Sequence, residues 1–272
     1  MKIGIHAQDR EQSPAQLIQR CKDVGAEGVC LGCNVIDGFE DKGVPDTDHL
    51  HRVLDELRGA GVEVPSVLGA RYSDTMFFGE TDGEKEQEAL YRTIEVLAEA
   101  GVESMLFWAI PSASENPAEK QEQLARVSSF FKGLGDHCAA VGFNIASHPW
   151  VSRPGMFHGF ATYREMCEGI ETPNIGITFC PGGQLAGDNL PQLIDDFQNR
   201  IHFAHVRDQI GNWESFEEVF PGEGECEVAG LVRKLRDSGY TGLICPEHWG
   251  AGAPGEDREA RAVAFIRDTL AT

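Results

Sequence analysis

Short apolar runs alternate with longer amphipathic segments along the whole chain. A short run rich in β-branched residues is typical of a buried strand, whereas apolar residues that recur every three or four positions are typical of a helix covering a sheet. By this criterion, strands are predicted over residues 2–7, 28–35, 62–69, 102–110, 142–149, 174–183, 200–208 and 241–250. No linker-like or low-complexity stretch interrupts the alternation, so we expect one domain over residues 1–272.

The intervals between these strands carry helical patterns over residues 13–25, 46–61, 84–101, 118–142 and 227–239. Ser13 followed by Pro14 is typical of a helix start. Each pattern ends at a glycine just before the next predicted strand, and glycine is the usual left-handed cap of a helix C-terminus. These glycines are Gly25, Gly61, Gly101, Gly142 and Gly239.

A regular alternation of strand and helix is typical of an α/β protein with a parallel sheet. Eight such units close into a (β/α)8 TIM barrel, and 272 residues match the usual size of that fold, about 250 residues. An open, doubly wound sheet is the alternative. It would normally show a glycine-rich turn after the first strand, and "IHAQDREQSP" has no such turn. We therefore expect the barrel.

The last four predicted strands end in side chains that can bind a metal ion: His148, Cys180, His205 and Glu247. In a TIM barrel the loops after the strands gather at one face, so these four side chains are expected to converge there. Imidazole, thiolate and carboxylate together are ligands for manganese, zinc, cobalt or iron, whereas magnesium prefers oxygen alone. The dispersed spacing differs from structural zinc modules and favours a catalytic site with open coordination positions.

Each of these residues alone has a structural alternative. A single histidine at the end of a strand is more often a packing residue than a ligand, and a single cysteine in this position is more often a buried thiol. The metal site therefore depends on all four residues together. It also depends on the strand register, because a shift by one residue turns a side chain to the other face.

The first four predicted strands end near His6, Asn34, Arg71 and Trp108. We expect these residues to line a substrate pocket, with Cys33 as the alternative to Asn34. The alternative role for Trp108 is core packing, and for Arg71 it is a solvated position in a loop.

The chain is strongly acidic, with 44 Asp and Glu against 23 Lys and Arg and a formal charge of −21. Such a surface repels phosphate backbones and anionic lipids, so neither nucleic acid nor a membrane is expected as a partner. No apolar run approaches the roughly 20 residues of a membrane span, and no long apolar segment precedes the first charges, so we expect a cytoplasmic protein. Eight cysteines are too few for a disulfide scaffold and are expected as reduced thiols. A homo-oligomer is compatible with this composition.

Four segments carry a resemblance to a known family: "NIGITFCPGG" (174–183), "NRIHFAHVRD" (199–208), "GEGECEV" (222–228) and "LRDSGYTGLICPEHWG" (235–250). Between about residues 140 and 250 the chain resembles the mannonate dehydratase family, within the xylose-isomerase-like barrels. The resemblance implies that His148, Cys180, His205 and Glu247 bind the divalent metal. Manganese is the first expectation, with zinc, cobalt or iron as alternatives.

The same resemblance implies an acid/base role for His248 and binding of a substrate carboxylate by Arg207. The sequence departs from the family at three points. Glu247 stands where the family has Asp, the segment directly after His248 has no tyrosine where the family supplies a catalytic one, and the chain is shorter than typical members.

Three functions are therefore predicted. The first is a metal-dependent sugar-acid dehydratase that removes water from an aldonate through a metal-stabilised enediolate. The alternative is a metal-dependent isomerase or epimerase acting on a sugar or sugar phosphate, which the missing tyrosine favours. A non-catalytic, metal-bearing barrel that binds a sugar is the third hypothesis, and it predicts a saturated coordination shell.

Overall fold

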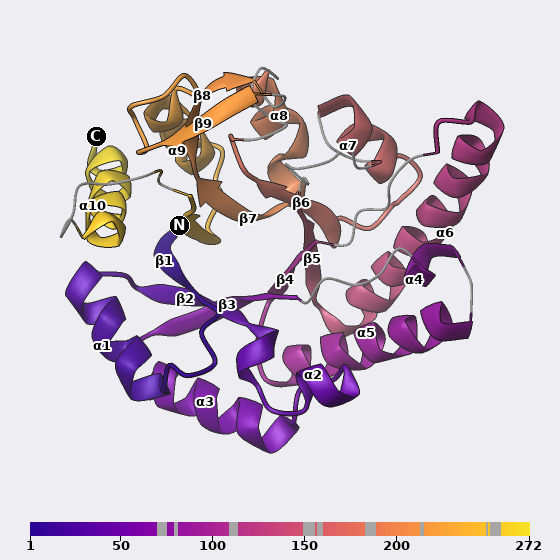
Figure 1. Cartoon of the computed structure of the whole chain (residues 1–272), viewed down its shortest axis with the longest axis horizontal. Helices are drawn as coiled ribbons and strands as arrows, with labels where there is room; N and C mark the ends of the chain where they lie inside the picture. Colours follow the sequence, from indigo (N-terminus) through magenta and orange to yellow (C-terminus); the bar gives the residue numbers. More distant parts are fainter. Residues whose placement is uncertain are drawn as a thin grey trace.

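Eight parallel strands close into a barrel that is surrounded by helices (Figure 1). The computed structural model describes residues 1–69, 75–78, 81–108, 114–148, 156, 160–182, 189–212, 215–248, 250 and 257–272. Around the barrel the strands have the order β1-β10-β7-β6-β5-β4-β3-β2, which confirms the predicted (β/α)8 fold. The strands are β1 (Lys2–Ala7), β2 (Gly28–Gly32), β3 (Glu63–Leu68), β4 (Ser104–Phe107), β5 (Asn144–Ser147), β6 (Ile175–Phe179), β7 (Ile201–Val206) and β10 (Leu243–Pro246).

The helices are α1 (Pro14–Val24), α2 (Phe39–Lys42), α3 (Thr47–Gly59), α4 (Thr75–Phe78), α5 (Thr81–Glu99), α6 (Pro117–Val141), α7 (Phe160–Cys167), α8 (Leu190–Phe197), α9 (Val228–Asp237) and α10 (Arg258–Ala271), with 3-10 turns η1 (Cys33–Val35) and η3 (Gln198–Arg200). Ser13 caps α1 through a reciprocal pair, because its Oγ accepts from the Gln16 N–H and the Gln16 side chain accepts from the Ser13 N–H. All five predicted capping glycines have a positive φ, between 72° and 88°. The predicted helix start at Ser13 and the predicted glycine caps are therefore confirmed.

The core has two layers, because successive side chains of a strand point to opposite faces. One layer lies between the strands and the helices and contains most of the buried apolar residues. The other fills the inside of the barrel and consists of Cys30, Leu68, Leu106, Ala146, Phe203, Leu243 and Cys245. Phe203 and Cys245 each stand two residues before a candidate ligand, so the interior layer directly supports the side chains at the mouth of the barrel.

Several predicted strands are too long at their C-terminal ends. The segment 28–35 leaves the sheet after Gly32 and continues as η1, and β4 ends at Phe107 rather than at residue 110. Apolar residues continue in the sequence past these points, so the apolar pattern predicts strands that are longer than the observed ones. The backbone must nevertheless leave the sheet to form the loops at the mouth.

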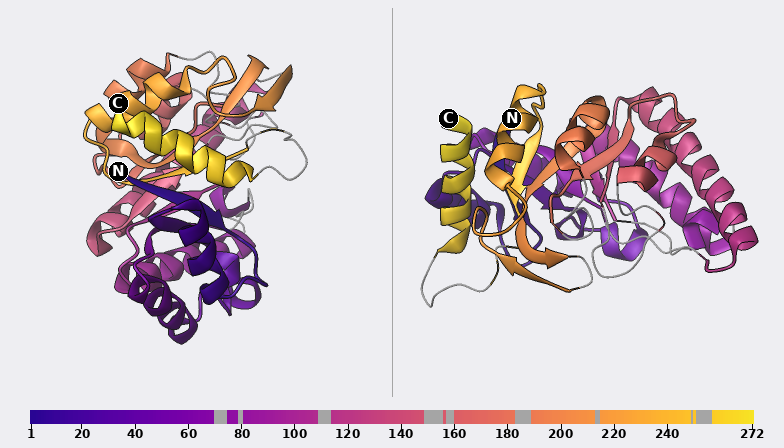
Figure 2. Two further views of the ribbon diagram at one scale, coloured as in Figure 1. Left: turned by 90° about the vertical axis from the view of Figure 1, so that its left-hand side faces the viewer. Right: turned by 90° about the horizontal axis from the view of Figure 1, so that it is seen from above.

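An antiparallel hairpin comes directly after β7 and was not predicted from the sequence. It consists of β8 (Asp208–Asn212) and β9 (Ser215–Val219), paired in register from Asp208 with Val219 to Asn212 with Ser215. Figure 2 shows this hairpin, in orange, projecting from the end of the barrel. Its strands are too polar to give an apolar run, so the pattern of the sequence does not reveal them.

The carboxylate of Asp208 ties this hairpin to the loop that leads into α9. Its Oδ1 accepts from the N–H groups of Gln209 and Cys226, at 2.9 and 3.1 Å. Its Oδ2 accepts from those of Gly222 and Gly224, at 2.9 and 3.0 Å. Asp208 is buried, and a buried carboxylate is tolerated when hydrogen bonds replace its hydration. We refer to this arrangement as the Asp208 clasp.

The structure bears on two other expectations. Among the residues that it describes, no helix is long and apolar enough to cross a membrane. All eight cysteines are described, and each is a free thiol, as the composition predicts.

Gly176 of β6 offers a test of how closely the strands pack. A Cβ atom at this position would overlap the carbonyl oxygen of Arg200, so we expect Gly176→Ala to lower the free energy of unfolding by about 1–3 kcal/mol. Gly133 is the matched control, because it lies exposed within α6 and a Cβ there meets only the Tyr91 hydroxyl, at 3.5 Å. Gly133→Ala should raise the free energy of unfolding by about 0.5–1 kcal/mol. Equal free energies of unfolding for the two variants in urea denaturation would contradict the close approach of Gly176 to Arg200.

Candidate metal centre

Four side chains that can bind a metal ion converge at the mouth of the barrel. His148 comes directly after β5, Cys180 directly after β6 and Glu247 directly after β10, whereas His205 lies in β7. These four strands are consecutive neighbours in the barrel, so their C-terminal ends meet although the residues are far apart in the sequence. One donor atom from each side chain lies within 4.8 Å of every other. The sequence prediction that they converge is therefore correct.

The distances between donor atoms suit a single ion. His205 Nδ1 lies 3.1 Å from Glu247 Oε2 and 3.1 Å from His148 Nε2. Cys180 Sγ lies 3.6 Å from Glu247 Oε2, and His148 Nε2 lies 3.9 Å from the same oxygen. Donors at about 2.0–2.3 Å from a tetrahedral ion are about 3.3–3.7 Å apart. The residues present therefore fit a small divalent metal with only slight adjustment.

Burial works against the charged forms of three of these donors, Cys180, His205 and Glu247. It raises the pKa of Cys180 to about 12 and raises the pKa of the Glu247 carboxyl. It lowers the pKa of His205 well below the usual value, so this imidazole is neutral and has a lone pair available. A thiolate and a carboxylate in such a place require a nearby positive charge. A divalent ion would supply it.

Arg207 is the cation that the protein itself places beside the site. Its side chain is only 2% exposed, pairs through Nη2 with Glu218 and lies 3.9 Å from Glu247 Oε2 through Nη1. Burial alone would lower the pKa of Arg207, but the acidic groups around it outweigh burial and raise the pKa. The guanidinium therefore faces carboxylates of the protein. Its predicted contact with a substrate carboxylate stays a prediction.

His248 stands at the rim of the mouth, with its side chain 51% exposed. Its Nδ1 lies 3.3 Å from Glu218 Oε2 and its Nε2 lies 3.6 Å from Glu247 Oε1. The backbone at His248 has a φ of 49°, a left-handed conformation that is uncommon for a residue with a side chain and that tends to occur at functional sites.

Glu218 is a residue of the site that sequence reasoning did not find. It lies in β9 and contacts both Arg207 and His248, one through each carboxylate oxygen. The segment "SFEEV" has no signal that distinguishes Glu218 from its neighbour Glu217. Only the hairpin places this carboxylate over the barrel.

The four residues predicted to line a pocket have different environments. His6 lies in β1, and its Nε2 is 2.9 Å from His205 Nε2. Trp108 meets the His148 ring edge-on, with 5.7 Å between the ring centroids. Asn34, in η1, donates from Nδ2 to the Gln8 carbonyl at 3.0 Å, and Arg71 lies outside the described residues. The structure therefore places His6 and Trp108 against candidate ligands.

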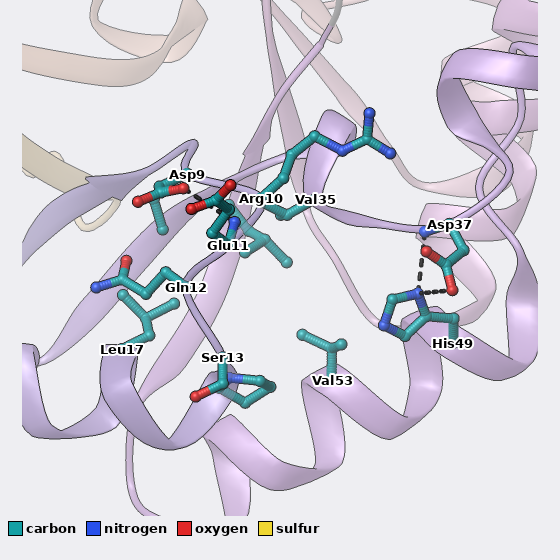
Figure 3. A pocket seen from close by; sticks show the side chains of 13 residues that line it. Asp9, Arg10, Glu11, Gln12, Ser13, Leu17, Val35, Asp37, His49 and Val53 are labelled. Carbon is teal, nitrogen blue, oxygen red and sulfur yellow. Dashed lines mark hydrogen bonds and ion pairs between the residues drawn. The ribbon is translucent and has the colours of Figure 1, made fainter.

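A separate cavity of about 380 Å³ lies beside β1 and β2, between these strands, α1 and α3 (Figure 3). Its described lining includes Ala7, Leu31 and His49, whose Nδ1 accepts from the Asp37 N–H, and none of the four candidate ligands. Ala7 and Leu31 belong to the outer core layer. This cavity is therefore on the outside of the barrel and is not part of the candidate metal centre.

Comparison with known proteins places the chain in a family. It belongs to the xylose isomerase-like TIM barrel family, whose sequence model matches residues 18–269. A mannonate dehydratase of Thermotoga petrophila is 31% identical over 144 residues, which cover 46% of this chain and 40% of that enzyme. The chain thus spans about half or less of the length of such curated relatives. The similarity to mannonate dehydratases that the four segments indicated is confirmed.

Solved structures share the fold at low sequence identity. A mannonate dehydratase from Streptococcus suis superposes with a TM-score of 0.80 at 16% identity, over 99% of this chain and 92% of that one. The 3-keto-D-glucoside 4-epimerase YcjR of E. coli gives 0.77 at 18% identity, over 98% and 99%. The IOLI protein, whose structure contains a zinc atom, gives 0.73 at 15% identity, over 99% and 96%. At these identities the likeness shows the fold alone.

We expect separate replacement of three candidate ligands by alanine, His148→Ala, Cys180→Ala and His205→Ala, to abolish stable metal binding. Each change removes one donor from the cluster. Metal content is measured by mass spectrometry after loading with Mn²⁺ or Zn²⁺ and desalting. Cys138→Ala is the matched control, because Cys138 is a buried thiol of α6 outside this cluster. Undiminished metal in all three ligand variants would show that the metal binds elsewhere.

Metal affinity should also rise with pH. Because burial holds the pKa of Cys180 at about 12, this thiol is protonated at neutral pH in the metal-free protein, and binding as a thiolate releases its proton. Below that pKa the affinity is therefore expected to rise by up to about tenfold per pH unit from this group alone. Chelator competition between pH 6.5 and 8.5 measures the slope of the logarithm of the affinity against pH, which gives the number of protons released on binding. In Cys180→Ser this number should fall by about one. An unchanged slope in Cys180→Ser would mean that the thiol is not a ligand.

Proposed function

We propose that this protein is a metal-dependent dehydratase that removes water from a small sugar acid. The observation that carries the proposal is the cluster of His148, Cys180, His205 and Glu247 at the mouth of the barrel. The partial match to curated mannonate dehydratases supports the same class of reaction. A formal charge of −21 disfavours nucleic acid and anionic membranes as partners, so the ligand we propose is a small sugar acid or sugar.

The donor set favours a transition metal over magnesium, because two imidazoles and a thiol accompany a single carboxylate. We propose Mn²⁺. Zn²⁺ is the alternative, which a thiolate ligand favours and which the IOLI structure contains, and Co²⁺ or Fe²⁺ suit the same donors. When bound, the ion would polarise the substrate carboxylate and stabilise the negative charge that develops as the α-proton leaves.

His248 is the proposed acid/base. Its Nδ1 faces the Glu218 carboxylate at 3.3 Å, so the tautomer with hydrogen on Nδ1 is favoured and the Nε2 lone pair can take a proton. This is the logic by which a carboxylate orients a catalytic imidazole in other enzymes. Exposure at the rim allows a substrate to reach the ring.

Arg207 is proposed to act on the protein's own carboxylates. It contacts Glu218 and approaches Glu247, and a positive charge at these positions favours the ionised form of both. A substrate carboxylate that bound the same guanidinium through Nη2 would compete with Glu218. We therefore propose that the metal, rather than Arg207, is the main anchor of the substrate carboxylate.

An isomerase or epimerase is the second candidate function. The segment directly after His248 contains no tyrosine, and structures of epimerases superpose over nearly their whole length. In both proposed reactions a proton leaves a carbon next to a carboxylate or a carbonyl group, so the same metal and His248 would serve either. They differ in whether a hydroxyl group leaves.

A turnover panel separates the candidates. Metal-loaded protein is incubated with aldonates, with aldoses and ketoses, and with sugar phosphates, in deuterium oxide. We expect a 2-keto-3-deoxy acid from one aldonate, detected by NMR and by its semicarbazone absorbance. A rearranged sugar that has incorporated deuterium without loss of water would instead establish the epimerase or isomerase. Bound metal without turnover of any compound would favour a binding protein.

For a substrate that is turned over, we expect His248→Ala to lower kcat by about 100-fold or more while metal content stays within twofold of the wild type. His51→Ala is the control, because His51 is exposed on α3. Activity of His248→Ala comparable to that of His51→Ala would exclude the proposed acid/base role.

A further inference from the structure

Three histidines form one layer at the mouth of the barrel. His6 lies in β1, His205 in β7, and His148 directly after β5. In the order of the barrel these three strands alternate with β10 and β6, and inward-pointing residues of alternate strands pack in a common layer. His205 is the middle ring, with its centroid 5.0 Å from that of His6 and 5.1 Å from that of His148.

The two ring nitrogens of His205 face different groups. Nδ1 faces the donor cluster, at 3.1 Å from both His148 Nε2 and Glu247 Oε2. Nε2 faces His6 Nε2 at 2.9 Å. A histidine that binds a metal through one nitrogen normally donates the hydrogen of the other to a fixed acceptor, and this contact orients the ring and sets its tautomer. Here the group in that place is a second imidazole.

We propose that His6 is a positioning residue for the metal ligand His205: it accepts the Nε2–H of His205 and so leaves the Nδ1 lone pair free for the ion. The inference rests on the proposed metal centre and deepens it. From the sequence, His6 was expected only to line a substrate pocket. It adds β1 to the four strands that carry the ligands.

The proton balance sets the direction of this hydrogen bond. In the metal-free protein, a hydrogen on His205 Nδ1 can be donated to Glu247 Oε2 at 3.1 Å, and His205 Nε2 then accepts from His6 Nε2–H. Metal binding at Nδ1 requires the hydrogen of His205 to be on Nε2, so His6 must become the acceptor and carry its own hydrogen on Nδ1. Each ring keeps one hydrogen and stays neutral in both states. Starting from that metal-free tautomer, the bond between the two rings would reverse when the metal binds.

The other nitrogen of the His6 ring does not decide between the two arrangements. His6 Nδ1 is buried and has no hydrogen-bond partner among the residues that the structure describes. A buried donor or acceptor without a partner costs about 1–3 kcal/mol, so this atom is unsatisfied in either tautomer. The ion would decide the direction of the bond, because it needs the Nδ1 lone pair of His205.

Two substitutions of His6 separate hydrogen bonding from packing. His6→Gln places an amide oxygen near the position of Nε2 and keeps an acceptor, whereas His6→Leu fills similar space without one. His202→Leu is the matched control. Like His205, His202 lies in β7, but it stands at the N-terminal end of the strand, away from the ligands. Its Nε2 contacts the Pro173 carbonyl at 2.8 Å. His205→Ala tests the metal centre itself in the same series.

The dissociation constants of Zn²⁺ and Co²⁺ are measured by chelator competition. We expect His6→Leu to weaken binding by about 10–100-fold and to alter the visible spectrum of the Co²⁺-loaded protein. His6→Gln should recover most of the affinity, and His202→Leu should bind as the wild type does. In the Zn²⁺-loaded wild type, ¹⁵N–¹H NMR of the imidazoles should find hydrogen on His205 Nε2 and on His6 Nδ1.

Wild-type affinity in His6→Leu, with binding lost in His205→Ala, would overturn the role of His6 and leave the metal centre intact. A Zn²⁺-loaded protein with hydrogen on His6 Nε2 would overturn it equally. Unchanged binding in both His6→Leu and His205→Ala would refute the metal centre, and the role of His6 with it.

Discussion

Desolvation of ionisable side chains at the mouth of the barrel is the constraint on which the rest of the site depends. Cys180, His205 and Glu247 are held around one point, where burial raises the pKa of the thiol and the carboxyl and lowers that of the imidazole. Arg207 is a cation that the protein itself places against this group. A divalent ion at this point would complete the charge balance of the three groups.

The site has an inner part built by strands and an outer part built by loops. The ligands and His6 lie in or directly after barrel strands, so their positions result from the closure of the sheet. Glu218 and His248 lie on the hairpin and the rim. Barrels of the same fold include dehydratases and epimerases. In this chain the strands fix the inner part, whereas the hairpin and the loops after the strands fix the rim.

The sequence predicts the parts of this molecule that depend on local patterns. The eight strands, the glycine caps and the four converging side chains were all found from runs of apolar residues and from the polar residues at the ends of those runs. The contact between His6 and His205 depends on which strands are alternate neighbours in a closed barrel, and no local pattern contains that information. Glu218 was missed for a different reason, because the polar strands β8 and β9 are held by the Asp208 clasp rather than by an apolar face.

The clasp also bears on how such a protein could change over evolutionary time. One side chain takes up four backbone N–H groups. Two of these belong to Gly222 and Gly224 of the loop, where an added side chain would meet Phe265 and Asp208, but none depends on the side chains of hairpin residues 210–219. Mutations along the hairpin could therefore accumulate without loosening its attachment to the barrel. The rim would then be an interchangeable module, able to change while the strands that carry the four candidate ligands stay as they are.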